Sequence, residues 1–478
     1  MKINLKLSVF YTFVCLSFFT KSYGANLPQS YDIVIYGGTS AGVLAAVQAA
    51  NMGKSVVLIE PGKHLGGMTS SGLSWVDVKT SKTIGGLAWK YFNQVWQYYL
   101  LDSSWIWETK YPIKGQLFHF HPDEHVMWTL EPSVGEKIFN AMIAEAKVPV
   151  IYNERLNRGS GVQLEGQRIV QIVMESGLTF NGKMFIDTTY EGDLMASSNV
   201  SYTVGREPNS QYQETSNGIH IDSSYTKKNP ILIDAFLVKG NPQSGLLPRV
   251  YPYSGGNEGE GDSGVQAYNY RMCLTDIPEN RVQIEKPEGY DESQYEILFR
   301  AIEASANPGP FFKLDLVPNR KTDSNNCGIV STDYVGMSWN YPEADYETRK
   351  EIALKHEQWQ RGLAWTLQNH PRVPAEIRAH YAPWGLSKDE FVDNNNWPYL
   401  LYMRETRRMV SPLVITEQMA LGNVLVEDSI GLAYYAMDSH AIKYVVNSNG
   451  FLEIEGGGVH KGFKTLSHQL PGNCTFAT

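Results

Sequence analysis

The chain has 478 residues, 42% of them hydrophobic and 19% charged, which is the composition of a globular protein and excludes a largely disordered one. Its 50 acidic residues outnumber its 41 lysines and arginines, giving a formal net charge of −9, so no basic surplus is present to neutralise a nucleic-acid backbone. At roughly 150 residues per domain, the length predicts about three domains or lobes.

The first 24 residues have the pattern of a secretory signal peptide. Lys2 and Lys6 precede an apolar run over 7–19, and the small residues Ser22 and Gly24 form a cleavage site. The apolar run is shorter than the about 20 residues that a membrane-spanning helix needs. We therefore expect export to a periplasm or to the outside of the cell, without a membrane span.

A strand, a glycine-rich turn, a helix and a second strand follow one another over residues 31–60. The second strand ends at Glu60, and the turn is Gly37-Gly38-Thr39-Ser40-Ala41-Gly42, in which Thr39 replaces the usual middle glycine. In such a βαβ unit, glycines let the backbone approach a pyrophosphate, and the helix N-terminus supplies N–H groups. An acid about 20 residues further on takes the ribose hydroxyls. The pattern predicts that residues 37–42 and Glu60 bind the ADP half of a dinucleotide.

Two other interpretations use the same turn. Residues 38–42 also fit G-x-S-x-G, the nucleophile elbow of α/β hydrolases, with Ser40 as the nucleophile. That elbow normally follows several strands and needs an oxyanion-hole loop upstream, whereas only the leader and a short segment precede it here. The second alternative is a βαβ unit that binds nothing.

Another glycine cluster follows Glu60 directly. It runs from Pro61 to Leu73 and contains Gly66, Gly67 and Met68. A loop at this place can wrap a long cofactor, whereas a nicotinamide-binding domain usually continues into another helix. The cluster therefore favours a flavin dinucleotide over a nicotinamide dinucleotide.

The stretch IYGGTSAGVLAAVQAANMGKSVVLIEPGKHLGGMTSSGL resembles the secreted FAD-dependent oxidoreductase family of bacterial glycan-degrading systems, some of whose members are labelled xanthan-lyase-like. The resemblance implies an α/β fold in which a discontinuous, Rossmann-like FAD-binding domain carries a mixed α+β substrate lobe. It implies FAD as the cofactor, and it places Gly66, Gly67 and Met68 further along that cofactor.

The resemblance continues through the middle of the chain. Sequence patterns predict a helix over 131–147, a strand over 148–152 and a β-hairpin over 168–185. The stretch 184–194 is similar to the family's loop that returns to the cofactor, which implies that Asp187 or Asp193 lies near FAD; a solvated turn is the alternative. Gly205-Arg206-Glu207 resembles the point where the family's chain leaves for the substrate lobe.

Residues 206–395 lack the βαβ rhythm and form the predicted substrate lobe. This segment contains a Gly- and acid-rich loop over 254–264 and a long amphipathic helix over 342–370, with Pro342 at its first position.

A group of three histidines precedes this lobe. His119, His121 and His125 have a spacing that can hold a metal, but lining of a substrate pocket and, above all, ordinary packing are the preferred interpretations. The sequence contains no C-x-x-C pair either. We therefore predict no metal site.

The candidates for chemistry lie near the C-terminus. Residues 396–409 resemble the family's R-E-x-R-R stretch; on a helix, Arg404 and Arg408 share one face and could hold a substrate carboxylate or stabilise negative charge on the reduced flavin. A structural Arg–Glu network between lobes is the alternative. His440 completes the match, and in this interpretation it takes a proton while hydride leaves for the flavin.

The resemblance ends near residue 455, and we expect an irregular, truncated tail. The predicted division of the chain is therefore a signal peptide over 1–24, an FAD-binding domain over 25–205 with an inserted segment at about 75–130, a substrate lobe over 206–395, a return to the FAD domain over 396–455, and the tail over 456–478.

The leading hypothesis is an exported FAD-dependent oxidoreductase that removes hydride from a small or carbohydrate-derived substrate. One alternative is a degenerate flavoprotein or flavin-free protein that binds a glycan through some of its 28 Tyr and 11 Trp residues. Another is a xanthan-like glycan lyase, which would leave the dinucleotide turn without a purpose.

Overall fold

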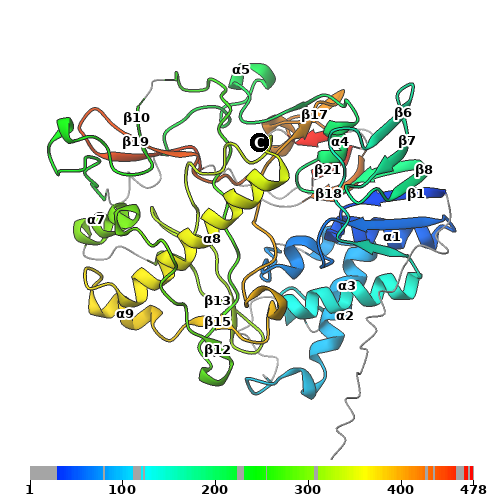
Figure 1. Ribbon diagram of the computed structural model, residues 1–478, viewed down its shortest axis with the longest axis horizontal. Helices are drawn as coiled ribbons and strands as arrows, with labels where there is room; N and C mark the ends of the chain where they lie inside the picture. The colour runs from blue at the N-terminus through cyan, green and yellow to red at the C-terminus, as the bar shows by residue number, and fades with distance from the viewer. Residues whose placement is uncertain are drawn as a thin grey trace, which may run out of the picture.

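The computed structural model describes residues 30–78, 81–110, 120–121, 124–222, 231–253, 256–305, 310–425, 429–433, 437–458, 468–471 and 474–476. The predicted signal peptide, His119 and most of the predicted tail lie outside these ranges. Figure 1 shows two lobes, with the N-terminal sheet and its helices on one side and the long helix α8 crossing the other.

A six-stranded sheet organises the first lobe. Its strands β1, β2, β5 and β8 run parallel, while β6 and β7 form an antiparallel hairpin at one edge. In spatial order the strands are β5 (Val150–Tyr152), β2 (Val56–Glu60), β1 (Tyr31–Tyr36), β8 (Thr179–Asp187), β7 (Arg168–Val173) and β6 (Val162–Glu165). Tyr36 at the end of β1 lies opposite Ile59 of β2 and Asp187 of β8, so these three strands end at one edge of the sheet.

Helices α1 (Ser40–Asn51) and α3 (Pro132–Ala146) cover one face of this sheet, and α2 (Gly86–Tyr99) packs against these two helices. Alternation along β1 sends Ile35 into the core with these helices and Val34 into the core on the opposite face. Helix α1 places Val43 and Val47 against Ile35. The predictions of β1, α1, β2 and α3 are confirmed, with boundaries that differ by a few residues.

The second lobe contains a five-stranded antiparallel sheet and three longer helices. The strands, in spatial order, are β12 (Arg281–Val282), β15 (Gly385–Ser387), β11 (Leu274–Thr275), β14 (Lys321–Asp323) and β13 (Asp315–Val317), and the helices are α7 (Glu296–Ala304), α8 (Tyr346–Asn369) and α9 (Ala375–Tyr381). Trp359, Leu363 and Leu367 of α8 are buried in the core of this lobe, as their helical spacing predicts.

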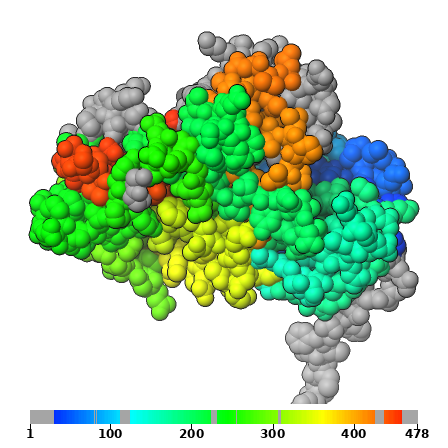
Figure 2. Space-filling model, turned by 90° about the horizontal axis from the view of Figure 1, so that it is seen from above, coloured from blue at the N-terminus to red at the C-terminus, as the bar shows by residue number. Residues whose placement is uncertain are grey.

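Helix α8 begins later than predicted. The sequence suggests Pro342 as the first helical residue, but α8 starts at Tyr346 because the side chain of Asp345 caps it by accepting a 2.7 Å bond from the Thr348 N–H. The polar face of α8 is exposed, and Figure 2 shows the helix in yellow as a strip between the two ends of the molecule. No helix in the described ranges combines the length and apolar character needed to cross a membrane.

Smaller elements complete the chain. A three-stranded sheet joins β10 (Val250–Pro252) to β19 (Lys443–Val446) and β20 (Leu452–Glu455). Two-stranded pairs form between β16 (Arg408–Met409) and β9 (Tyr202–Thr203), β17 (Leu413–Ile415) and β22 (Cys474–Phe476), β18 (Ser429–Ala433) and β21 (His468–Pro471), and β3 (Phe120–His121) and β4 (Val126–Met127). The short helices are α4 (Asp193–Ser197), α5 (Asn209–Tyr212) and α10 (Glu417–Ala420).

The helical geometry considered for residues 396–409 is wrong. This segment is irregular apart from β16, since Tyr402 donates a 2.7 Å backbone bond to Asn269 and Met409 pairs with Tyr202. Arg404 and Arg408 therefore do not share a helix face.

A buried ion cluster joins the two lobes. The Lys321 ammonium of β14 lies 2.7 Å from Glu131, 2.6 Å from Glu390 and 2.9 Å from Asp389. Glu390 of the second lobe also accepts a 2.8 Å bond from the Ser133 N–H, in the first turn of α3. The second lobe thus supplies the cap of a first-lobe helix, and this contact fixes the position of α3 beside the loop that follows β2.

Candidate functional site

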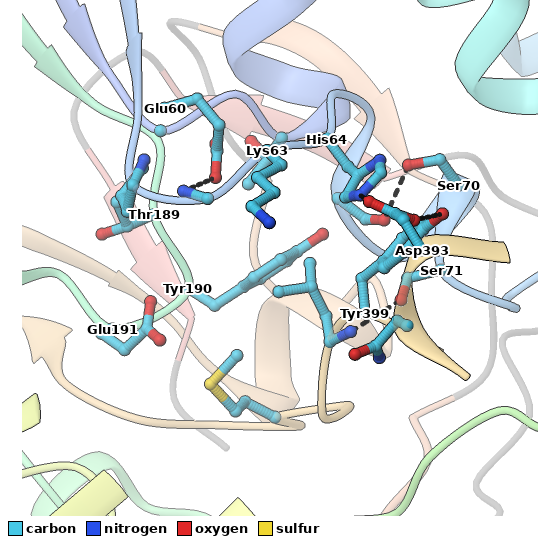
Figure 3. A pocket seen from close by; sticks show the side chains of 18 residues that line it. Glu60, Lys63, His64, Ser70, Ser71, Thr189, Tyr190, Glu191, Asp393 and Tyr399 are labelled. Carbon is cyan, nitrogen blue, oxygen red and sulfur yellow. Dashed lines mark hydrogen bonds and ion pairs between the residues drawn. The ribbon is translucent and has the colours of Figure 1, made fainter. Parts of the chain in front are cut away.

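A cavity of about 400 Å³ lies at the carboxyl edge of β1, β2 and β8 (Figure 3). In open α/β sheets, ligands bind at this edge, beyond the ends of the parallel strands. The first lobe contributes residues 37, 39, 60–64, 67, 70, 71 and 189–191 to its lining, and the second lobe contributes Asp393, Asn394, Tyr399, Leu400 and Met403.

The glycines of the first turn sit where no side chain fits. Gly37 has φ +108°, and a Cβ there would lie 2.8 Å from the Thr189 nitrogen. A Cβ on Gly42 would lie 2.0 Å from the Gly37 carbonyl oxygen, so only glycine lets α1 pack this closely on the end of β1. Gly37 and Thr39 of this turn line the cavity.

The side chain of Thr39 forms hydrogen bonds at this turn. Its hydroxyl donates a 2.8 Å bond to the Thr188 carbonyl and accepts from the Gly42 N–H at 3.3 Å, which makes Thr39 the N-cap of α1. Ser40 and Ala41 then form the first turn of α1, which begins at the cavity. Thr39 at the place of a glycine is therefore compatible with the turn.

Glu60 lies across the turn at the end of β2. Its carboxylate accepts backbone bonds of 2.6 Å from both Gly38 and Gly62. Burial raises the pKa of Glu60 to about 7, although the two N–H donors oppose this shift. The carboxylate therefore stands at the cavity in the position that the sequence predicts for the ribose-binding acid.

The loop after β2 packs against Tyr190. Gly66 and Gly67 both have positive φ, and the Met68 N–H donates a 2.8 Å bond to the Tyr190 hydroxyl. Burial raises the pKa of Tyr190 to about 12. Ser71 accepts a 2.7 Å bond from the Leu400 N–H and so connects this loop to the second lobe.

Asp187 and Asp193 hold the loop that carries Tyr190, and neither lines the cavity itself. Asp187 accepts bonds from Thr189 and from the Met195 N–H. Asp193 is buried among three arginines, which are Arg349 at 2.6 Å, Arg407 at 2.6 Å and Arg158 at 3.3 Å.

Two of the three candidate catalytic residues meet on one carboxylate. The Arg404 guanidinium lies 2.9 Å from Asp333 Oδ1, and His440 Nδ1 lies 2.7 Å from Asp333 Oδ2. Burial alone would raise the pKa of Asp333, but Arg404 and His440 outweigh it and hold that pKa below its ordinary value. Arg408 is bound elsewhere, to Glu207 at 2.8 Å and Glu405 at 3.3 Å, in a buried Arg–Glu network.

Several wall residues are not found by sequence reasoning. His64, Asp393 and Tyr399 come from two lobes and meet on one side of the cavity (Figure 3). Figure 3 also shows Lys63 extending into the cavity, and its ammonium has no ion-pair partner among the described residues. The pair Lys63-His64, three residues after the predicted ribose-binding acid Glu60, is a signal that could have found both residues.

Of the three histidines of the first lobe, His125 is the one whose side chain the structure describes. His119 and the side chain of His121 lie outside the described residues, and the His125 ring stacks on Trp96 with 4.8 Å between centroids. Within the ranges that the structure describes, no group of three or more His, Cys, Asp or Glu side chains is placed to hold a metal ion.

Comparisons with known proteins give partial matches of two kinds. A vinyl phenol reductase from Lactiplantibacillus plantarum is 35% identical over 92 residues, which cover 16% of this chain and 19% of that protein. An L-proline dehydrogenase from P. horikoshii has a TM-score of 0.25 at 15% identity, covering 38% of this chain and 59% of that one. An L-amino acid deaminase from Proteus vulgaris has a TM-score of 0.27 at 16% identity, covering 38% and 53%. This chain thus spans about a fifth of the curated relative and under two thirds of either structure.

A family model covers far more of the chain. The model described as FAD dependent oxidoreductase matches residues 32–464, a range that includes both lobes and every residue lining the cavity. The chain therefore belongs to the family of FAD-dependent oxidoreductases, and FAD is its cofactor.

Proposed function

We propose that the protein is an exported FAD-dependent oxidoreductase that removes hydride from a small or carbohydrate-derived substrate. The observation that carries this proposal is the cavity, which begins at the backbone-lined turn and Glu60 and ends against Leu400 and Met403 of the second lobe. Export is supported by the leader pattern of residues 1–24.

The residues present fit a dinucleotide. A side chain at Gly37, Gly42 or Gly67 would collide with neighbouring atoms, so the turn offers the backbone surface that a pyrophosphate needs. In this proposal residues 37–42 hold the pyrophosphate, Glu60 accepts from the ribose hydroxyls, and Gly66, Gly67 and Met68 follow the cofactor toward the second lobe. Asp187 and Asp193 act indirectly, by holding the loop that carries Tyr190.

Bound FAD supplies a hydride acceptor. The protein's own contribution centres on Asp333, which lies outside the cavity lining together with His440 and Arg404. Its carboxylate accepts from His440 Nδ1, so in this proposal Nε2, which lies 3.7 Å from Asp438, takes a proton from the substrate. Asp333 also fixes Arg404, whose guanidinium would neutralise an anionic group of the substrate. Arg408 has a supporting role, since its partners Glu207 and Glu405 anchor the segment that carries Arg404.

The first test is a visible absorbance spectrum of the purified chain without residues 1–24, before and after addition of FAD and removal of the unbound part. We expect a two-band flavin spectrum. A folded sample that holds no flavin would contradict the proposal and would favour a glycan-binding role.

The second test asks which residues handle the proton. Candidate alcohols, amines and sugars would be screened for anaerobic bleaching of the flavin. With a substrate that bleaches it, Asp333→Asn and His440→Gln should slow bleaching by about a hundredfold or more while the flavin stays bound. Asp276→Asn, which removes a carboxylate from the Arg320 pair elsewhere in the second lobe, is the control and should leave the rate unchanged.

A further inference from the structure

His64 joins the two walls of the cofactor cavity. It belongs to the loop after β2, and its ring stacks on Tyr399 with 3.5 Å between centroids and 9° between planes. Its Nδ1 lies 3.0 Å from Glu136 of α3, and its Nε2 lies 3.1 Å from Asp393 of the second lobe. The Tyr399 hydroxyl donates a 2.9 Å bond to the same Asp393 carboxylate. One imidazole thus contacts the first-lobe helix and the second-lobe wall together.

The geometry fixes the charge of this imidazole. An ionised carboxylate only accepts hydrogen bonds, so contacts with Glu136 and Asp393 require an N–H on both ring nitrogens. A doubly protonated ring is an imidazolium. Burial would lower the pKa of His64, but Glu136 and Asp393 outweigh burial and hold it above the ordinary histidine value.

We propose that His64 is a positioning residue for the cofactor, and that its imidazolium keeps the cavity closed by tying the loop after Glu60 to Asp393 and Tyr399. The inference rests on FAD binding in this cavity. It goes beyond the proposed oxidation because it concerns how the cofactor is retained, and it does not depend on the substrate.

Deprotonation weakens one of the two ties. A neutral imidazole has one N–H, so one carboxylate loses its donor. The hydrogen bond to Asp393 is the one that is lost, because half of the Asp393 side chain is exposed and water can solvate it. Glu136, in contrast, is largely buried. The stabilisation is complete below the ordinary histidine value and is lost as pH rises through the raised pKa of His64.

Other titratable groups lie near His64 at the same cavity, and the experiment must separate their effects from that of His64. Lys63 precedes His64 in the loop, and Glu60 at the end of β2 changes its charge near pH 7. A pH effect in the wild-type protein alone would therefore mix several causes. The informative quantity is the difference between the wild-type protein and variants that cannot titrate at position 64 or cannot pair at position 393.

The experiment is a titration of the FAD-free chain with FAD, followed by quenching of flavin fluorescence, at about pH 6 and about pH 9, on either side of the ordinary histidine value. For the wild-type protein we expect the dissociation constant of FAD to rise by about fivefold between the two, the effect of losing one partly exposed charged hydrogen bond. His64→Gln and Asp393→Asn should remove most of this dependence, and both should bind FAD at the lower pH about as weakly as the wild-type protein does at the higher pH.

Glu145→Gln is the matched control, since Glu145 lies on α3 like Glu136 but pairs with the exposed Lys90. It should keep the wild-type pH dependence. If both variants also keep it, or if the wild-type protein binds FAD equally well at the two values, the role of His64 is refuted while the FAD site stands. If the folded wild-type protein binds no FAD at either value, the proposed function fails together with this inference. Because Asp393 is half-exposed, Asp393→Asn keeps the test valid even if His64→Gln does not fold.

Discussion

At the scale of single residues, the site is defined by the places where backbone must touch backbone. The turn after β1 and the turn after β8 approach so closely that the atom nearest to a Cβ at Gly37 or Gly42 is a main-chain atom, the Thr189 nitrogen in the first case and the Gly37 carbonyl oxygen in the second. Main-chain atoms cannot rotate away as the end of a side chain can. The requirement for glycine here is therefore one of space as well as of φ.

Replacing Gly42 by alanine tests this requirement. The added Cβ would lie 2.0 Å from the Gly37 carbonyl oxygen and 2.6 Å from Thr188 Oγ1, so α1 must move away from β1. We expect the free energy of unfolding to fall by about 1–3 kcal/mol and FAD binding to be lost. Thermal melting and FAD titration measure both effects. Gly85→Ala is the control, because a Cβ there meets nothing within 4 Å and φ is −148°; equal losses in the two variants would contradict the argument.

Some of the site residues can be identified from the sequence, and others cannot. Gly37, Gly42 and Glu60 are identifiable because their spacing along one βαβ unit determines their positions in space. Tyr190, His64 and Asp393 are not, since they meet only after chain segments more than 100 residues apart come together. Sequence patterns report local geometry, and this wall of the cavity is made by tertiary contacts.

At the scale of elements, Asp193 is the point that fixes several segments. It starts α4, and its carboxylate binds Arg349 of α8, Arg407 beside β16 and Arg158 after β5. Burial alone would raise the pKa of Asp193, but the three arginines outweigh it and hold that pKa below its ordinary value. The family resemblance implies that Asp187 or Asp193 lies near the cofactor; in the structure Asp193 is outside the cavity lining and binds the three arginines.

Asp193→Asn should destabilise the fold by about 3–5 kcal/mol at neutral pH, because three guanidinium groups lose their shared counter-charge. The stabilisation by Asp193 is present above the ordinary aspartate value and is lost as pH falls through the lowered pKa of the folded state. The gap between the melting temperatures of the two proteins should therefore be steady from neutral pH to about pH 5 and narrow below about pH 4. Glu165→Gln, in the exposed pair with Arg168, should melt like the wild-type protein at every pH.

The start of a helix matches the sequence prediction only where one local start signal is present. Helix α3 begins at Pro132, one residue after the start of the predicted range 131–147, but α8 begins four residues after Pro342, where the side chain of Asp345 caps it. The segment 396–409 carries charges and apolar residues that suit a helix, yet it is irregular, and Tyr402 and Met409 pair with Asn269 and Tyr202. Backbone pairing with distant segments outweighs the helical sequence pattern of this segment.

At the scale of the whole molecule, the lobes share a buried charge cluster in addition to the cavity. Lys321 is surrounded by Glu131 from the first lobe and by Glu390 and Asp389 from the second. Its ammonium uses three donors on three carboxylates, which is the full capacity of a lysine. The cluster is one of the contacts that fix the relative position of the lobes, and with it the shape of the cofactor cavity.

Lys321→Met removes the cation and keeps most of the side-chain volume. Two buried carboxylates and a half-buried one then face one another without a counter-charge, and we expect the free energy of unfolding to fall by about 3–5 kcal/mol. Chemical denaturation followed by circular dichroism gives this value. Lys90→Met is the control, since it breaks only the exposed pair with Glu145 and should cost under about 1 kcal/mol. A loss no larger than that of the control would show that the cluster does not hold the lobes together.

The cap of α3 is synthesised much later than the helix itself. Ser133 and the Glu390 carboxylate that receives its N–H are 257 residues apart in the chain. At a synthesis rate of about 5–20 residues per second, α3 exists for roughly 13–50 s before its cap has been made. During that interval the remaining strands of the sheet are synthesised after the glycine turn and α3, but the start of α3 still lacks Glu390, and Glu131 has its partner Tyr99 but still lacks Lys321. The cofactor site of this protein therefore becomes complete only late in synthesis, when the second lobe arrives.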